Sequence, residues 1–195
     1  MEIPKTHPME IIDARNTDRT FEQERNISDN QCNSTKKQKT QFQIRKLEEQ
    51  DIQDMLSLFY STVLNVNIRD YTREEVEDWA SCGDKPERWR ELMTGNLFIG
   101  AFDGHNCLAG FSSMNKDGHL HSMFVHKDCQ GQGVATQLLS EVEQIARQYG
   151  VSEITSEVSL TARTFFEKHG YKIVRMQKQR AKKLELTNFA MRKIL

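Results

Sequence analysis

The chain has 195 residues, of which 37% are hydrophobic and 28% charged, and its formal net charge is −1. This balance gives no overall field that would attract nucleic acid or an anionic membrane, so either partner would need a local basic patch. A mean hydropathy of −0.69, without a long apolar run, predicts that no segment spans a membrane.

Targeting and cysteine signals are weak. The first residues have neither the basic nor the apolar region of a signal peptide, so we expect a cytoplasmic protein. The cysteines show no CxxC pair and no spacing to histidine that is typical of zinc sites; they are Cys32, Cys82, Cys107 and Cys129. We therefore expect reduced thiols, no metal, and a surface turn for Cys129.

Residues 1–41 differ in composition from the rest of the chain. They are rich in Asn, Gln, Ser, Thr and charged residues, and their few apolar residues follow no period. Such a segment buries too little apolar surface to offset its ordering entropy, so we predict a disordered tail followed by one domain over residues 42–195. A partner-binding arm is the alternative, and its evidence is three lysines: Lys36, Lys37 and Lys39.

From Phe42 onward, alternating and helical patterns follow one another. Residues 42–47 alternate like a strand. Three helices are then predicted, one after Asp51 as N-cap, one opened by a capping box at Thr72–Glu75, and one with Pro86 in its first turn. Three strand-like runs come next, separated by the turn signals Asp103-Gly104 and Asp117-Gly118, and they predict an antiparallel meander.

The last third of the chain predicts a parallel crossover. Apolar residues from Val134 to Tyr149 recur at helical spacing, and Gly150 ends that helix. A strand, a helix near residues 161–169 and two further strands follow. The sequence therefore predicts an α/β (α+β) fold with a mixed, mostly antiparallel sheet flanked by helices, and a ligand site at its topological switch point.

The junction between residues 125 and 136 carries the strongest functional signal. Gly131 and Gly133 stand where a strand passes into a helix. A helix N-terminus offers unpaired N–H groups and a positive dipole end, and glycine lets a bulky anion approach the backbone. A Walker A loop needs Gly-Lys-Ser/Thr, and a dinucleotide fingerprint needs glycine in place of Thr136, so neither fits.

What fits is Gln130-x-x-Gly133-x-Ala135, which resembles the Q/R-x-x-G-x-G/A signature of the GCN5-related N-acetyltransferase (GNAT) family. The stretch from Thr161 to Tyr171 resembles the last helix of that family, and the order of elements from Phe42 agrees. The segments 70–89 and 186–191 are similar to those of small bacterial YafP-type acetyltransferases. The resemblance covers roughly the last 150 residues.

The resemblance implies acetyl-CoA as acyl donor and no metal. It places the pantetheine arm and thioester on the backbone of Met123, Phe124 and Val125. It assigns the pyrophosphate to the loop and first helical turn, which comprise Gln130, Gly131, Gln132, Gly133, Val134, Ala135 and Thr136. Ser159 takes the place of a pantetheine-binding asparagine.

The reaction that the resemblance implies is direct attack of a primary amine on the thioester. His119 and His121 lie where family members place a general base, and histidine suits this role because its pKa is near neutrality. Many members carry a tyrosine acid where this chain has Phe166, so His169, Tyr171 or water would protonate the leaving thiolate. His126 is expected to face solvent.

Asn67, Tyr71 and Trp79 fall in the segment that the resemblance places beside the acceptor, although core packing is the simpler interpretation for the tryptophan. The acceptor class stays open between a small amine, a protein lysine or N-terminus, and an aminoacyl-tRNA. The near-neutral charge argues against RNA. A homodimer also stays open, as does a non-catalytic module that senses acetyl-CoA, for which Phe166 is the evidence.

Overall fold

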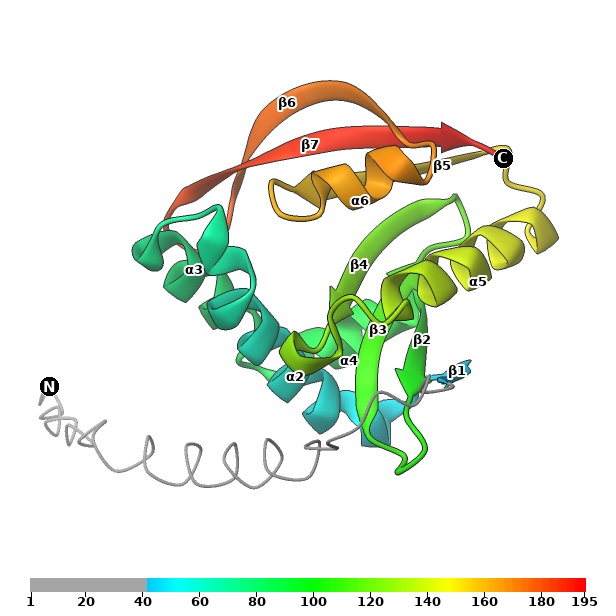
Figure 1. Cartoon of the computed structure of the whole chain (residues 1–195), viewed down its shortest axis with the longest axis horizontal. Helices are drawn as coiled ribbons and strands as arrows, with labels where there is room; N and C mark the ends of the chain where they lie inside the picture. Colours follow the sequence, from blue (N-terminus) through cyan, green and yellow to red (C-terminus); the bar gives the residue numbers. More distant parts are fainter. Residues whose placement is uncertain (1–41) are drawn as a thin grey trace, which may run out of the picture. The chain divides into compact units, whose positions relative to one another are not determined.

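The structure is a computed structural model that describes residues 42–195 (Figure 1). These residues contain a seven-stranded sheet in the order β1-β2-β3-β4-β5-β7-β6. The strands are β1 (Gln43–Lys46), β2 (Leu97–Phe102), β3 (Leu108–Met114), β4 (His119–Val125), β5 (Glu153–Ser159), β6 (Lys172–Arg180) and β7 (Glu185–Ile194). All neighbouring strands are antiparallel except β4 and β5, so the predicted mixed, mostly antiparallel sheet is confirmed.

The helices agree with the predicted elements. They are α2 (Ile52–Asn65), α3 (Arg73–Ala80), α4 (Pro86–Gly95), α5 (Val134–Gln148) and α6 (Arg163–Lys168), with short 3-10 turns η1 (Glu49–Asp51), η2 (Asn67–Arg69), η3 (Ser81–Gly83) and η4 (Lys127–Cys129). The Thr72–Glu75 capping box forms with both of its hydrogen bonds. The Asp51 side chain does not cap α2 as expected, because it accepts from the backbone of Glu48 and pairs with Arg45.

Two hydrophobic cores lie on the two faces of the sheet. Along β2, Ile99 and Ala101 pack into one core while Phe98 and Phe102 pack into the other, as the two-residue period of a strand requires. The first core is closed by α5 and α6, and the second by α2, α3 and α4. Both cores include residues of β2, β3 and β7, so the described residues fold around one sheet.

The parallel pair in the middle of the sheet is short. Only His119↔Thr155 and Leu120↔Ser156 are in register, after which β4 and β5 diverge. Figure 1 shows the two strands separating, with α6 above the gap and the N-terminal end of α5 beside it. A gap at this position leaves backbone groups of both strands free to bind a ligand, as expected at a topological switch point.

Three local expectations were wrong. Tyr149 is 41% exposed, because it follows the last turn of α5 and points away from the core. His126 is buried, since its N–H extends β4 by donating to the carbonyl of Ala109 and its Nδ1 accepts from the N–H of Asp128. Cys129 is also buried, because η4 turns back against the core. The expectations for residues 1–41, including Cys32, concern a part of the chain outside the described residues.

Candidate active site

A pocket of about 670 Å³ occupies the gap between β4 and β5 and extends toward α3 and α4. One part is lined by the end of β4, the glycine loop, the first turn of α5 and the start of α6. The other part is lined by side chains from η2, α3, η3, α4, β6 and β7. The cavity is therefore continuous from the helix N-terminus of α5 to the polar strands on the opposite side.

The glycine loop has the backbone geometry of an anion site. Gly131 and Gly133 adopt positive φ angles of 73° and 87°, and α5 begins directly after Gly133. A Cβ atom built on either glycine would meet nothing within 4 Å, so the space above the loop is open. The first N–H groups of α5, at Val134, Ala135 and Thr136, border this open space without intrahelical partners.

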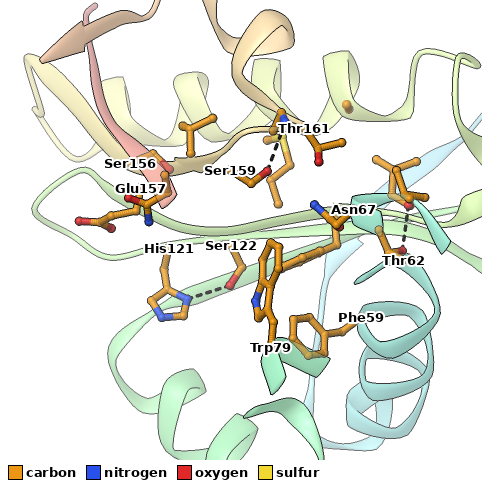
Figure 2. A pocket seen from close by; sticks show the side chains of 18 of the residues that line it. Phe59, Thr62, Asn67, Trp79, His121, Ser122, Ser156, Glu157, Ser159 and Thr161 are labelled. Atoms are coloured by element: carbon orange, nitrogen blue, oxygen red, sulfur yellow. Dashed lines mark hydrogen bonds between the residues drawn. The ribbon is translucent and has the colours of Figure 1, made fainter. Parts of the chain in front are cut away.

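Two side chains hold the end of β4 against this loop. Nε2 of Gln130 donates to the carbonyl of Val125 at 2.7 Å, and Oγ1 of Thr62 in α2 donates to the same oxygen at 3.0 Å (Figure 2). Since this carbonyl is occupied twice, it is not available to a ligand. Gln132 is the one residue of the predicted phosphate loop outside the pocket lining, and its side chain donates to the carbonyl of Asp128.

Backbone groups of β4 point into the gap. The N–H of His126 donates to Ala109 in β3, and backbone groups alternate in direction along a strand. Met123 and Val125 therefore direct their N–H groups away from β3 and toward the diverging β5, and Met123 also directs its carbonyl there. The two N–H donors and the one carbonyl acceptor lie where the resemblance to the GNAT family places the pantetheine arm and the thioester. Across the gap, the Ser159 hydroxyl accepts from the N–H of Ala162, which fixes the turn into α6.

Of the two histidines predicted as general bases, one lines the pocket and the other does not. His121 lies at the register shift between β3 and β4 and lines the pocket, with Nδ1 2.8 Å from the hydroxyl of Ser122 (Figure 2). Burial by the surrounding protein lowers the pKa of His121, and the charges of His119 and Arg88 lower it further. His119 lies outside the lining, and its Nε2 is 3.0 Å from the carboxylate of Glu157, which does line the pocket.

The two residues predicted as general acids, His169 and Tyr171, do not line the pocket. Nδ1 of His169 is 2.8 Å from the carbonyl of Phe165, which assigns a proton to that nitrogen, and Nε2 lies 3.4 Å from the hydroxyl of Thr136. Tyr171 is buried in the core against Phe166, and burial raises its pKa strongly. Phe166 itself lines the pocket but has no proton to donate.

The predicted acceptor residues do meet in the pocket. Asn67, Tyr71 and Trp79 all line it, and Tyr71 packs edge-on against Trp79 with ring centroids 5.7 Å apart. The Tyr71 hydroxyl donates to the carbonyl of Thr187 at 2.7 Å and accepts from the N–H of Leu160 at 3.0 Å. Burial raises the pKa of Tyr71, so this hydroxyl stays protonated at neutral pH.

Several lining residues escaped the sequence analysis. They are Glu157, Arg88, Asn188 and Thr161. Arg180, which also lines the pocket, belongs to the basic run 178–183, for which the sequence left open a solvated hairpin or an attraction for an acidic or RNA acceptor. Glu157 alternates with buried residues along β5 and so reads as an ordinary exposed strand position. Its role depends on β4, which lies beside β5 only in the folded chain. Within residues 42–195, no cluster of side chains could hold a metal ion, and no helix is long and apolar enough to cross a membrane.

Known proteins share this sequence pattern and fold. Residues 67–194 match the family described as Acetyltransferase (GNAT) domain. The N-acetyltransferase YafP of Escherichia coli (strain K12) is 27% identical over 152 residues, which are 77% of this chain and 95% of that protein. A GCN5-related N-acetyltransferase from Rhodopseudomonas palustris superimposes with a TM-score of 0.76 at 27% identity, over 79% of this chain and 96% of that one.

The PaiA N-acetyltransferase from Thermoplasma acidophilum, solved in complex with coenzyme A, has the same fold. Its TM-score is 0.64 at 21% identity, over 80% of this chain and 99% of that one. Because the family match spans more than half of the sequence, the chain belongs to the GNAT family of acetyltransferases. The predicted family, fold and enzyme class agree with these findings.

Proposed function

We propose that this acetyltransferase moves the acetyl group of acetyl-CoA to a primary amine by direct attack on the thioester. One observation carries the proposal: a single cavity joins the anion-binding end of α5 to His121 and Glu157. An acyl donor held at one end and an amine deprotonated at the other would meet beside β4. No residue in this arrangement has to carry the acetyl group between the two substrates.

The donor would be bound mainly by backbone groups. The loop at Gly131 and Gly133 and the first turn of α5 would hold the pyrophosphate, because they combine unpaired N–H groups, a positive dipole end and open space. The pantetheine arm would then extend into the gap, where the N–H groups of Met123 and Val125 face it. A donor at this position would stabilise the oxyanion that forms as the amine attacks.

The base would be His121, with Glu157 beside it. Because burial lowers the pKa of His121, its imidazole is neutral at neutral pH and can accept a proton from the amine, directly or through water. His119 would act through Glu157, since its Nε2 contacts that carboxylate and would hold its orientation. The amine nitrogen then forms the new bond to the acetyl carbon.

Breaking the carbon–sulfur bond would leave a thiolate that needs one proton. Tyr71 is the hydroxyl in the pocket lining that burial keeps protonated, and it lies beside the end of β5. To donate to the sulfur, or to a water that bridges to it, the Tyr71 proton would leave its hydrogen bond to the carbonyl of Thr187. Phe166 and Tyr171 would serve packing instead, because one has no acidic proton and the other does not line the pocket.

The test is a thiol-release assay with acetyl-CoA and a panel of primary amines, with the acetylated product identified by mass spectrometry. We expect turnover with at least one amine and a loss of turnover in Glu157→Gln. Tight binding of acetyl-CoA without transfer to any amine would instead favour a module that only senses acetyl-CoA.

A further inference from the structure

Few Lys, Arg, His, Asp or Glu side chains line the pocket, and the cationic ones outnumber the carboxylates. They are two arginines, Arg88 and Arg180, one carboxylate, Glu157, and His121. No other Lys, Arg, Asp or Glu in residues 42–195 contributes to the wall. The side opposite the glycine loop therefore carries excess positive charge although the chain as a whole is near neutral.

Arg88 lies on α4 without an acidic partner. Its Nη1 donates to the carbonyl of Cys82 at 3.0 Å, and within residues 42–195 no carboxylate lies at ion-pair distance from it. One carbonyl leaves most of the five guanidinium donors unused, and a guanidinium fork fits a planar anion with two oxygens. Arg88 is also close enough to His121 to act on it electrostatically, so it stands near the proposed base.

Arg180 reaches the same part of the pocket from β6. It is the last residue of that strand and forms no ion pair with any described carboxylate. The turn after it is fixed by Asp78 of α3, whose Oδ2 accepts from the N–H groups of Lys182, Lys183 and Leu184. Asp78 therefore anchors the turn that follows Arg180.

Both arginines line the same pocket, and hydrogen bonds connect the segments that carry them. Arg88 donates to the carbonyl of Cys82, whose thiol donates to the carbonyl of Asp78, and Asp78 anchors the turn after Arg180. On β7, Asn188 lines the pocket with its Oδ1 buried and without a partner, while its Nδ2 donates to Gln179. A buried acceptor without a donor is costly, and a bound ammonium or hydroxyl would satisfy it.

We propose that the acceptor is a small molecule that carries an anionic oxyacid group, in the simplest case a carboxylate, as well as the primary amine. Arg88 and Arg180 would bind the anionic group, which would direct the amine toward Glu157 and His121. The inference rests on the proposed function, since it assigns a chemical class to the acceptor of that reaction. A protein lysine has no such group beside its amine and fits this rim poorly.

The experiment compares matched pairs of acceptors. Free amino acids are assayed against their carboxamides, which keep the primary amine and the side chain but replace the carboxylate by a neutral group and lower the pKa of the amine. Aminoalkyl phosphonates form a third arm. We expect kcat/KM to favour the acid over its amide by about tenfold or more, since charge-assisted hydrogen bonds are the stronger ones. Preference for phosphonates would identify the oxyacid without changing the proposal.

Charge-removing variants locate the effect. Arg88→Gln and Arg180→Gln should each raise the KM for the acid while leaving the KM for its amide and for acetyl-CoA unchanged. Lys178→Gln is the control, because Lys178 is an exposed cation of the same strand that does not line the pocket. Equal acid and amide kinetics in the wild-type protein, or arginine variants that behave like Lys178→Gln, would overturn the inference.

Binding separates failure of this inference from failure of the proposed function. Calorimetry with the protein loaded with coenzyme A measures acceptor affinity without any transfer. If no amine is acetylated but acids bind more tightly than amides, the acetyl-transfer mechanism is wrong and the anionic subsite stands. If amines are acetylated and no acid is preferred in either assay, the transfer stands and the subsite is wrong.

Discussion

The hydroxyl of Tyr71, which precedes α3, donates a hydrogen bond of 2.7 Å to the carbonyl of Thr187 in β7, 116 residues further along the chain. The same oxygen accepts from the N–H of Leu160 just after β5. Tyr71 thus ties the acceptor side of the pocket to the strands that carry Glu157 and Asn188.

Tyr71→Phe should remove both hydrogen bonds while keeping the ring packed against Trp79. We expect the free energy of unfolding to fall by about 1–3 kcal/mol, because a buried N–H and a carbonyl lose their partner. Chemical denaturation checks this value. If Tyr71 is also the proton donor, the substitution should lower kcat more for an acetyl thioester with a poor leaving thiolate than for one with a good leaving thiolate. An equal fall in kcat with both thioesters would mean that Tyr71 has only a structural role.

Gly133→Asp should strongly weaken acetyl-CoA binding, and Gly133→Asn is its matched control. Both side chains meet open space and both tolerate positive φ better than other residues, so the two variants share any backbone strain. They differ in one negative charge at the end of α5. We expect the aspartate variant to bind acetyl-CoA about a hundredfold more weakly than the asparagine variant, measured by calorimetry. Equal affinities would contradict an anion site there.

His121→Gln should lower kcat by about 100-fold or more if the imidazole is the general base. In the wild-type protein, burial lowers the pKa of His121 below its ordinary value of 6.5. The neutral imidazole is the active form, so kcat should fall as the pH drops through this lowered pKa and should be level near neutrality. A pH series of kcat checks the sign. An acidic limb that persists in the glutamine variant would assign the titration to another group.

Asp78→Asn should loosen the β6–β7 turn, because one carboxylate oxygen accepts from three successive N–H groups. These bonds lower the pKa of Asp78, so its stabilising effect is present at neutral pH and is lost as the pH falls through the lowered value. The melting temperature should fall at pH 7 and the KM of the acceptor should rise. The KM of acetyl-CoA serves as the internal control, since the glycine loop is not part of this turn.

The elements of the fold could be predicted from the sequence because each of them depends on local order. The periods of α2 and α5, the capping box at Thr72 and the turns at Gly104 and Gly118 involve residues close together in the chain. The glycine loop belongs to the same group, since positive φ at Gly131 and Gly133 and the start of α5 are adjacent. The loop that we propose for the donor could therefore be located from the sequence.

The acceptor half was decided only by tertiary structure. Glu157 faces His121 because β4 and β5 pair over two residues and then diverge, and Arg180 reaches the rim because Asp78 anchors a turn more than a hundred residues away. Burial of His126 and Cys129 likewise depends on what packs over η4. Such contacts join residues distant in sequence, and each residue taken alone reads as an exposed polar position or a surface turn. Sequence patterns show how residues adjacent in the chain are arranged. The charge and shape of this pocket depend instead on residues that are far apart in the chain and meet only in the folded protein.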